Sequence, residues 1–188
     1  MQLNIYIISH PIIEIMMNKI IYSQSNNIQK YYKKIGLLMV YEVLRKWMKI
    51  QTIYIKQINQ IKELCILNTK ESYVIITNLV ESYPMITDID DLLPSINIQH
   101  INQPIDPIKL QNSYILQKIN NTSKILIFEL FLNNYEIIKL LNYLLLKKNI
   151  KTSQIKILCI TCNHKILEKL GQMHPKLNIY TTKIITNE

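Results

Sequence analysis

The sequence predicts an α/β fold in which a mainly parallel central sheet is flanked by helices. Short β-rich runs alternate along the chain with segments of helical periodicity. Several of these runs are continuously apolar, which is typical of strands buried on both faces of a parallel sheet. The 188 residues, 48% of them hydrophobic, are enough for one domain with a full-sized core.

The first 48 residues are predicted to form an N-terminal helical segment. Apolar side chains recur at helical spacing in His10–Tyr22, and a second such stripe runs through Ile28–Trp47. Ser25–Asn27 supplies a cap between the two helices. Residues 49–188 are predicted to form the α/β core, so that residues 1–188 make a single domain.

The core is predicted from the order of its apolar runs. Strands are expected at Gln51–Ile55, Tyr73–Thr77, Ile96–Ile101, Ile125–Glu129, Ile155–Cys162 and Leu177–Thr182. Helices are expected from about Pro84 to Pro94, over Asn134–Lys148 and over His164–Met173. Tyr114–Ile119 is interpreted as a further strand, part of a flap.

The candidate site lies in the loops that follow the strands, because parallel sheets bind ligands at the carboxyl ends of their strands. These loops are Asn78–Tyr83, Asn102–Ser113 and Leu130–Glu136. A glycine-rich loop is the usual means of bringing backbone N–H groups to a phosphate. The only two glycines, Gly36 and Gly171, lie instead in helical patterns.

The composition carries a strong bias. The chain has no alanine, and Arg45 is the only arginine among 22 basic residues, whereas Ile, Asn and Lys are in excess. This usage indicates an AT-rich genome, such as that of an organelle or of a reduced endosymbiont. The formal charge of +9 fits attraction to nucleic-acid phosphates, but the scattered lysines and the lack of arginine favour a solvated surface enlarged by codon bias.

No membrane span, disulfide framework or metal site is expected. The longest apolar runs, such as Ile137–Leu146, fall far short of the roughly 20 residues that a span requires. Leu3–Ile8 is too short for a signal peptide. Three cysteines, Cys65, Cys159 and Cys162, suit a reducing compartment. Cys159 and Cys162 are three apart on a predicted strand and should point to opposite faces, which argues against a shared zinc.

Several short motifs follow one another in a fixed order along almost the whole chain. They are His10-Pro11, Ile35–Glu42, Val74–Ile86, His100-Ile101, Ile125–Lys148 and His174–Thr181. In order and spacing they resemble the motifs of uracil phosphoribosyltransferase. The resemblance implies a type I phosphoribosyltransferase-like fold, transfer from phosphoribosyl pyrophosphate (PRPP) to uracil to give UMP, and a dimer. Together with the AT-rich composition it suggests a plastid-encoded homologue of the red-algal type, located in the chloroplast stroma.

The resemblance also gives positions for the site, and these depart from the family pattern. Val80, Glu81 and Ser82 stand where the family has Arg-Ala-Gly in the loop that binds pyrophosphate. The change removes a cation and a glycine that lets the backbone approach the ligand. It also adds a carboxylate, which repels pyrophosphate.

The phosphoribosyl loop departs in the same direction. Glu129 stands for the family's ribose-binding Asp, and Asn134, Tyr135 and Glu136 stand for its phosphate-binding Thr-Gly-Gly. Glu136 thus puts negative charge where a phosphate would bind. Asn133 and Asn134 tolerate left-handed backbone, so they are expected to cap the next helix and are able to hold an anion there.

Two further departures are expected. The hood near residues 102–119 is reduced. The family's glycine-rich uracil-binding segment should follow Thr181 by about a dozen residues, but the sequence stops at Glu188, so we expect the homologue to be truncated at its C-terminus.

Three functions remain open from the sequence. The first, which the losses favour, is a pseudoenzyme that keeps the fold without a catalytic residue, metal or cofactor and acts in binding, regulation or assembly, as a homodimer or a subunit of a larger complex. The second is an active uracil phosphoribosyltransferase with a remodelled site, which would require magnesium (Mg). The third is a basic RNA-binding module. Binding of PRPP or uracil is doubtful in the first and third.

Overall fold

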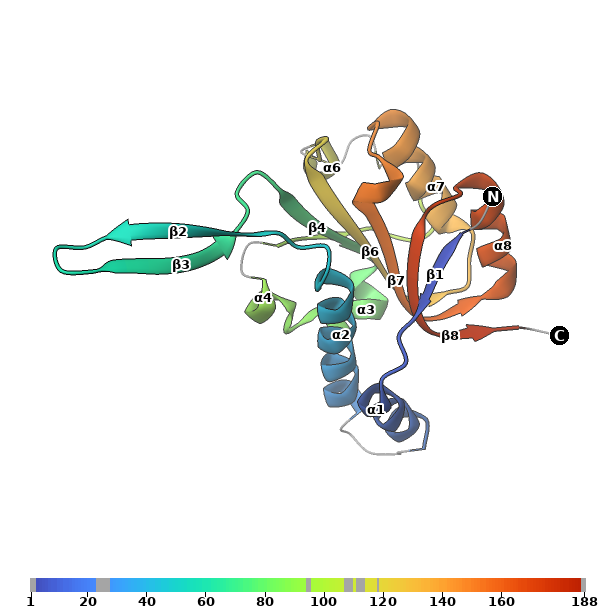
Figure 1. The fold of residues 1–188 in the computed structure, drawn as a ribbon. Coiled ribbons are helices and arrows are strands. Elements are labelled where there is room, and N and C mark those ends of the chain that lie inside the picture. Colours follow the sequence, from blue (N-terminus) through green and yellow to red (C-terminus); the bar gives the residue numbers. More distant parts are fainter. Residues whose placement is uncertain are drawn as a thin grey trace.

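A parallel six-stranded sheet forms the centre of the structure, which is a computed structural model that describes residues 3–22, 28–93, 96–106, 110, 114–117 and 119–186. The strand order within these residues is β1-β8-β7-β6-β4-β5 (Figure 1). The strands are β1 (Asn4–Ile7), β4 (Ser72–Thr77), β5 (Asn97–His100), β6 (Ser123–Leu132), β7 (Ile155–Asn163) and β8 (Asn178–Ile185). Each neighbouring pair is parallel. The predicted α/β class is confirmed.

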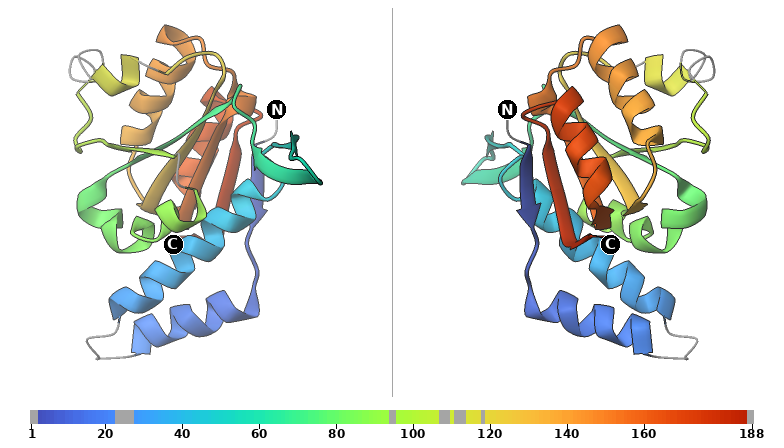
Figure 2. Two further views of the ribbon diagram at one scale, coloured as in Figure 1. Left: turned by 90° about the vertical axis from the view of Figure 1, so that its left-hand side faces the viewer. Right: turned by 90° about the vertical axis from the view of Figure 1, so that its right-hand side faces the viewer.

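Helices cover both faces of this sheet (Figure 2). They are α1 (Pro11–Tyr22), α2 (Ile28–Leu44), α3 (Leu79–Ile86), α4 (Ile89–Leu92), α6 (Tyr114–Gln117), α7 (Glu136–Asn142) and α8 (His164–Met173). The helix predicted at Asn134–Lys148 is α7 continued by a π-helical turn, Tyr143–Lys147. None of the helices in the described parts of the chain is long and apolar enough to cross a membrane.

Alternate residues of the strands build two separate cores. Along β6, Ile125 and Ile127 belong to the cluster that includes the buried side chains of α7 and α8, and Leu126 and Phe128 belong to the cluster with α1–α4. All four side chains are buried. A strand covered on both faces reads as a continuous apolar run, which is why the sequence identified this one.

The predicted N-terminal segment contains a strand as well as its two helices. β1 pairs in parallel with β8, with Tyr6 opposite Tyr180, and forms one edge of the sheet. Its four side chains are all exposed, so the strand lacks the buried apolar run by which the other strands were recognised. Ser25–Asn27, the predicted cap, lies outside the described residues, as does Pro94. The assignment of residues 1–188 to one domain stays a prediction.

A two-stranded antiparallel hairpin projects from the body of the molecule (Figure 1). It consists of β2 (Ile50–Lys56) and β3 (Ile61–Leu67). The predicted strand Gln51–Ile55 is confirmed, but it belongs to this hairpin and not to the central sheet. β3 was not predicted, because charged residues interrupt its apolar pattern.

Two predicted elements differ in kind. The predicted loop Asn78–Tyr83 is mostly helical, because the Asn78 side chain caps α3 and the helix therefore begins at Leu79, five residues before Pro84. The predicted strand at Tyr114–Ile119 is wrong: α6 covers Tyr114–Gln117. Leu116 and Ile119 are both buried in one core cluster, and their spacing of three suits a helix better than a strand.

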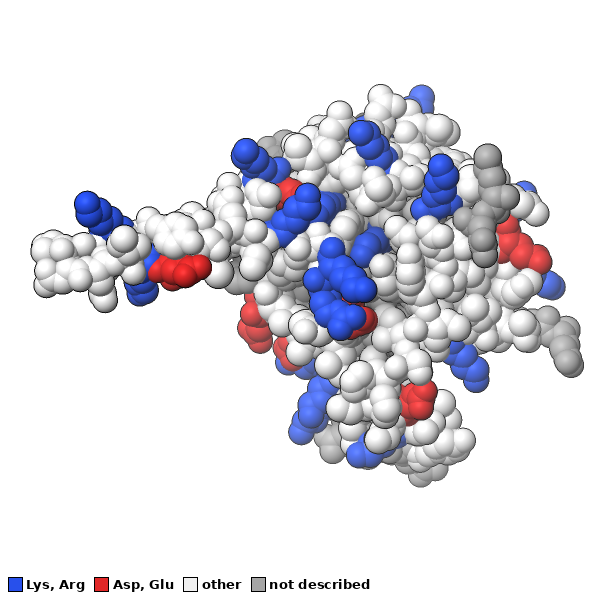
Figure 3. Space-filling model, viewed as in Figure 1, with Lys and Arg blue, Asp and Glu red and all other residues white. Residues whose placement is uncertain are grey.

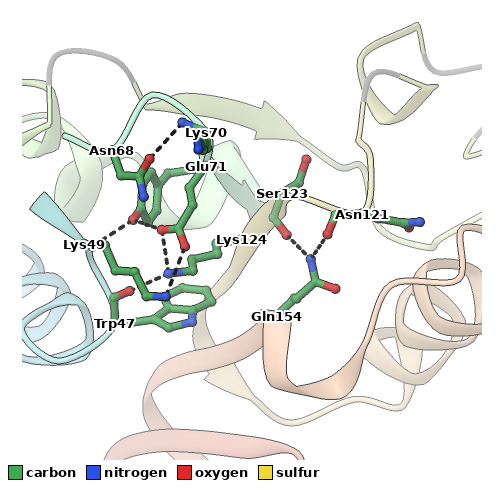
Figure 4. A network of polar contacts seen from close by, with 10 residues as sticks. Trp47, Lys49, Asn68, Lys70, Glu71, Asn121, Ser123, Lys124 and Gln154 are labelled. Atoms are coloured by element: carbon green, nitrogen blue, oxygen red, sulfur yellow. Dashed lines mark hydrogen bonds and ion pairs between the residues drawn. The ribbon is translucent and has the colours of Figure 1, made fainter. Parts of the chain in front are cut away.

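A polar network joins the end of α2 and the base of the hairpin to the sheet (Figure 4). The Lys124 ammonium donates to a Glu71 carboxylate oxygen at 2.7 Å and to the Trp47 carbonyl at 2.6 Å. The Tyr73 hydroxyl donates to the same carboxylate oxygen at 2.8 Å. Burial would raise the pKa of Glu71, but its bonds to Lys124 and Tyr73 outweigh this effect and lower the pKa. The network therefore holds a charged carboxylate at the amino ends of β4 and β6.

Gly36 allows α2 to pack directly against the backbone of α3. A Cβ atom at Gly36 would overlap the carbonyl oxygen of Met85 and lie 2.7 Å from its carbonyl carbon. A Cβ at Gly171 in α8 would instead meet the Leu3 side chain at an ordinary 3.7 Å. The two helical glycines therefore have different structural roles.

We expect Gly36→Ala to lower the free energy of unfolding by about 1–3 kcal/mol, because α2 and α3 must separate to admit the methyl group. Gly171→Ala is the matched control and should be neutral or stabilising by up to about 1 kcal/mol, since alanine is the better helix former. Urea denaturation measures both. Equal effects of the two substitutions would contradict the close approach.

Candidate functional site

The carboxyl ends of β4, β5 and β6 lie side by side, because these three strands are neighbours in the sheet. The segments that follow them are the three loops in which the sequence predicted the site. β6 extends to Leu132, so part of the predicted loop Leu130–Glu136 is strand. The predicted location is therefore a real junction of loops, and its chemistry depends on the side chains that fill it.

The first side of the junction is the start of α3, which carries Val80, Glu81 and Ser82. The Asn78 side chain accepts a hydrogen bond from the Val80 N–H at 3.2 Å. The Ser82 hydroxyl is buried, lies 2.7 Å from the Thr77 hydroxyl and donates to the Asn78 carbonyl at 2.8 Å. The Val80 side chain is 82% exposed. The polar groups of Thr77, Asn78 and Ser82 therefore form hydrogen bonds within this turn and cap the start of α3.

The second side is the end of β5. The Nδ1 atom of His100 accepts from the Leu79 N–H at 3.0 Å, and its Nε2 lies 2.6 Å from the Asn102 side-chain oxygen. Because Nδ1 is an acceptor, the proton is on Nε2 and is donated to Asn102. His100 therefore fastens the start of α3 to the chain leaving β5, and neither ring nitrogen is left for a ligand.

The third side is Glu129 on β6. The Gln103 side-chain amide donates to its two carboxylate oxygens at 3.4 and 3.3 Å. Burial, and then the negative charge of Glu81, raise the pKa of Glu129 to about 7, although the Gln103 bond acts in the opposite direction. A carboxyl group that is half protonated near neutral pH thus lies at the position of the predicted ribose contact.

A short strap, residues 102–106, crosses the junction. The Gln103 side-chain oxygen accepts from the Asn134 amide at 2.8 Å, and the peptide bond between Gln103 and Pro104 is cis. The Ile105 N–H donates to the Glu136 carboxylate at 2.7 Å. Gln103 was not predicted as a site residue. The only signal for it in the sequence is the following proline, which marks an irregular turn.

The turn between β6 and α7 keeps its own negative charge. Lys139 donates to both oxygens of Glu136 at 2.8 and 3.1 Å, and this bond, followed by the Ile105 N–H, lowers the pKa of the carboxyl group. The Asn134 side chain accepts from the Glu136 N–H at 3.1 Å, but the N-cap residue of α7 is Tyr135 and not the predicted Asn133 or Asn134. A left-handed backbone is not used: the described non-glycine residues with positive φ are Asn149 and Lys176. Asn133 closes a tight turn through its N–H to Phe131, and the Tyr135 side chain is 54% exposed.

The carboxylates of Glu81, Glu129 and Glu136 therefore surround the junction. The neighbouring ammonium of Lys139 is bonded to Glu136. Glu81 and Glu129 repel each other, and Lys139 is engaged by Glu136. In the described parts of the chain no group of three or more His, Cys, Asp or Glu side chains is placed to hold a metal ion. The absence of a resident metal or cofactor stays a prediction. The arrangement favours hydrogen bonding to neutral or cationic groups over binding of phosphates.

The two neighbouring thiols of β7 correct one expectation. Cys159 and Cys162 were expected on opposite faces, but both belong to the same core cluster. The Cys159 thiol donates to the Tyr180 carbonyl at 3.7 Å and the Cys162 thiol to the Lys183 carbonyl at 3.8 Å. The interaction with the neighbouring Cys162 thiol and burial raise the pKa of Cys159, and the interaction with Cys159 lowers the pKa of Cys162 to about 7. The strand loses its regular alternation here: the Thr181 and Thr182 hydroxyls donate to the Ile160 carbonyl.

Comparison with known proteins agrees with the fold and the order of motifs. A family model described as uracil phosphoribosyltransferase matches residues 7–187. A protein of Aquifex aeolicus, AQ2163, has a similar structure with a TM-score of 0.72 over 97% of this chain and 88% of its own, at 13% sequence identity. At that identity the likeness supports the fold alone.

Sequence relatives cover nearly the whole chain. The "uracil phosphoribosyltransferase homolog" of Pyropia yezoensis is 33% identical over all of this chain and 91% of its own length. The corresponding protein of Porphyra purpurea is 30% identical over 98% of this chain and 89% of its own length. The uracil phosphoribosyltransferase of Synechocystis is 23% identical over 97% of this chain and 88% of its own length. The chain belongs to the uracil phosphoribosyltransferase family.

Proposed function

We propose that this protein is a non-catalytic member of its family that acts through binding or assembly. The observation that carries the proposal is the strap, in which Gln103 and Ile105 bond to Glu129 and Glu136 across the ends of the strands. These bonds engage the two side chains that the family resemblance assigns to ribose and phosphate binding.

Charge supports the same proposal. PRPP carries several negative charges, and its pyrophosphate would have to approach Glu81, Glu129 and Glu136. Two unit charges about 5 Å apart repel by about 3 kcal/mol at an effective dielectric constant of about 20. The nearby cation Lys139 is already paired with Glu136, so it offsets little of this repulsion. An active transferase would have to displace the strap and neutralise these carboxylates, for which magnesium bound with PRPP is the available cation.

We propose that the assembly includes a second copy of the chain. The β2–β3 hairpin projects from the body, and apolar side chains on it are strongly exposed: Tyr54 and Ile61 at 69% each and Ile58 at 102%. An isolated two-stranded hairpin is marginal in water, and exposed apolar side chains gathered on it indicate an interface. The dimerisation implied by the family resemblance makes a second copy the simplest partner.

Figure 3 shows how Lys and Arg are distributed on one face of the molecule. They are scattered, apart from one cluster where α2 ends, and do not follow a continuous track. A nucleic-acid backbone is best bound by a continuous row of cations. This distribution supports the RNA-binding alternative less than binding or assembly.

We propose that the protein is encoded and works in a plastid. Two supports converge on this location. The composition, with one arginine and no alanine, indicates an AT-rich genome. The relatives at 33% and 30% identity come from Pyropia yezoensis and Porphyra purpurea.

The loss of catalysis is tested by incubating pure protein with uracil, PRPP and magnesium. We expect no UMP above background, and no heat of binding when PRPP with magnesium reaches millimolar concentration. The Synechocystis relative, assayed in parallel, is the positive control. Formation of UMP that depends on both substrates would refute the proposal.

The carboxylates of the junction predict opposite responses to pH. The pKa of Glu129 is raised to about 7, so its contribution to stability is present below about pH 4.5 and is lost as the pH rises to about 7. Glu129→Gln should therefore stabilise the protein at pH 8 by about 1–3 kcal/mol and have little effect at pH 4.

Glu136→Gln is the matched comparison. The pKa of Glu136 is lowered by Lys139 and the Ile105 N–H, so its contribution is present at neutral pH and is lost as the pH falls below its usual range. This variant should be destabilised at pH 7 and approach the parent protein in acid. Urea denaturation between about pH 2 and pH 8 measures both, because the contribution of Glu136 is lost only below its usual pKa range. Differences that do not change with pH would contradict the assigned environments.

Replacing Tyr54 and Ile58 by lysine should dissociate the dimer, because the two charges would be buried at the interface. We expect light scattering after size exclusion to give twice the 22.3 kDa of one chain for the parent protein and a single-chain mass for the double variant. Leu146→Lys, at a side chain that is 72% exposed elsewhere, is the control and should leave the mass unchanged. A monomeric parent protein would rule out the homodimer.

A further inference from the structure

A second cavity lies away from the strap, beside the face of the sheet that α1 and α2 cover. It has a volume of about 590 Å³ and is formed by the segment that follows β1, by the first half of α1, by the end of α2, and by β7 and β8. Ile13 and Leu38 supply apolar walls, and the rings of Tyr6 and Tyr180, stacked at 4.7 Å, form another wall. Pockets of this size accommodate small molecules.

Among the described residues that line this cavity, Lys156, near the start of β7, is the one buried cation. Its side chain is 7% exposed. The ammonium group donates to the Val43 carbonyl and to the Tyr180 hydroxyl, both at 3.0 Å, which leaves its third proton without a partner among these bonds. It also lies 4.9 Å from the centre of the Trp47 ring and 4.8 Å from that of Tyr180.

Lys156 has no carboxylate to neutralise it. Among the residues that the structure describes, no acidic side chain forms an ion pair with its ammonium, whereas Lys124, Arg45 and Lys139 all have such partners. Burial, and then the positive charge of Lys124, lower the pKa of Lys156 to about 8. Buried charges in proteins are usually paired, because removal from water is costly.

The remaining charges around the cavity do not supply the missing anion. The carboxylate of Glu42 also lines it, but this group bonds to Arg45 at 2.9 Å. The cavity is therefore lined by three cations, Arg45, Lys46 and Lys156, and by one carboxylate. The formal charge of these four side chains is +2. Figure 3 shows the cluster of cationic side chains at the end of α2.

We propose that this cavity binds a small organic anion, a carboxylate with an aliphatic or aromatic body, whose acidic group pairs with Lys156. The apolar body lies against Ile13 and Leu38 and the stacked tyrosine rings. The pairing supplies the anion that the buried ammonium lacks, and the walls contribute by removing apolar surface from water. The binding site is separate from the strap and does not depend on whether PRPP binds there.

The chain carries its own reporter for this site. Trp47 is the only tryptophan, and its ring contacts the Lys156 ammonium. Octanoate is a suitable probe, because it does not absorb where tryptophan is excited. We expect a saturable change in Trp47 emission on titration with octanoate. Octanol, which has the same body without charge, and inorganic phosphate, which has charge without the body, should each bind at least tenfold more weakly.

Lys156→Met keeps the volume of the side chain and removes its charge, so octanoate affinity should fall at least tenfold. Lys183→Met, which removes an exposed lysine from β8, is the matched control and should leave the affinity unchanged. Ser9→Phe fills the mouth of the cavity from its exposed rim and should also block binding, which provides a test should Lys156→Met fail to fold.

Circular dichroism establishes that each variant is folded before titration. The proposal would be overturned if octanoate showed no saturable binding to the parent protein. It would also be overturned if Lys156→Met or Ser9→Phe bound octanoate as tightly as the parent protein does, or if octanol bound as tightly as octanoate.

Discussion

The close contact between Gly36 of α2 and the Met85 backbone of α3 is the constraint on which much of the structure depends. It sets α3 against the sheet and so fixes the capped turn after β4, where Asn78 and Ser82 satisfy each other. It also brings the end of α2 over the amino ends of the strands, where Lys124 donates to the Trp47 carbonyl. One helix pair thereby positions both the strap junction and the second cavity. A side chain at Gly36 would disturb the two together.

At the strap junction the protein supplies its own anion. A helix N-terminus favours negative charge, and in phosphate-binding proteins a bound phosphate exploits this preference. In α7 the carboxylate of Glu136 is held there by Lys139 and by the Ile105 N–H. Glu129, which is bonded to the same strap through Gln103, has a less favourable environment, since burial and Glu81 oppose its ionisation. The junction thus combines a carboxylate whose charge is stabilised with one whose ionisation is opposed, and both disfavour a phosphate.

The sequence predicted most of the sheet because buried strands have continuous apolar runs, as in β6 and β7. It did not predict β1, which is exposed and pairs with β8 at the other end of the chain. It also did not predict β3, where charged residues interrupt the apolar pattern. Strand order correctly predicted that the ends of β4, β5 and β6 are neighbours, and the role of the loops there as a site stays a prediction. The strap was not foreseen, because the bonds of Gln103 to Glu129 and Asn134 join residues about 30 positions apart. The shared face of Cys159 and Cys162 depends on a local irregularity of β7 that no spacing rule gives.

The buried ammonium of Lys156 is a feature that a protein needing only a stable fold would not require. If only the fold mattered, a methionine at Lys156 would fill the same space without removing an ammonium group from water, and replacing buried charges by apolar groups of similar volume is often neutral or stabilising. The lysine is instead held between two aromatic rings and beside a cavity, with Lys124 adding repulsion. Glu129 can relieve its burial by taking up a proton near neutral pH, whereas Lys156 with a pKa of about 8 remains mostly charged there. The lysine therefore gains most from an external anion, and this difference favours the cavity beside α2, more than the strap junction, as the proposed ligand site.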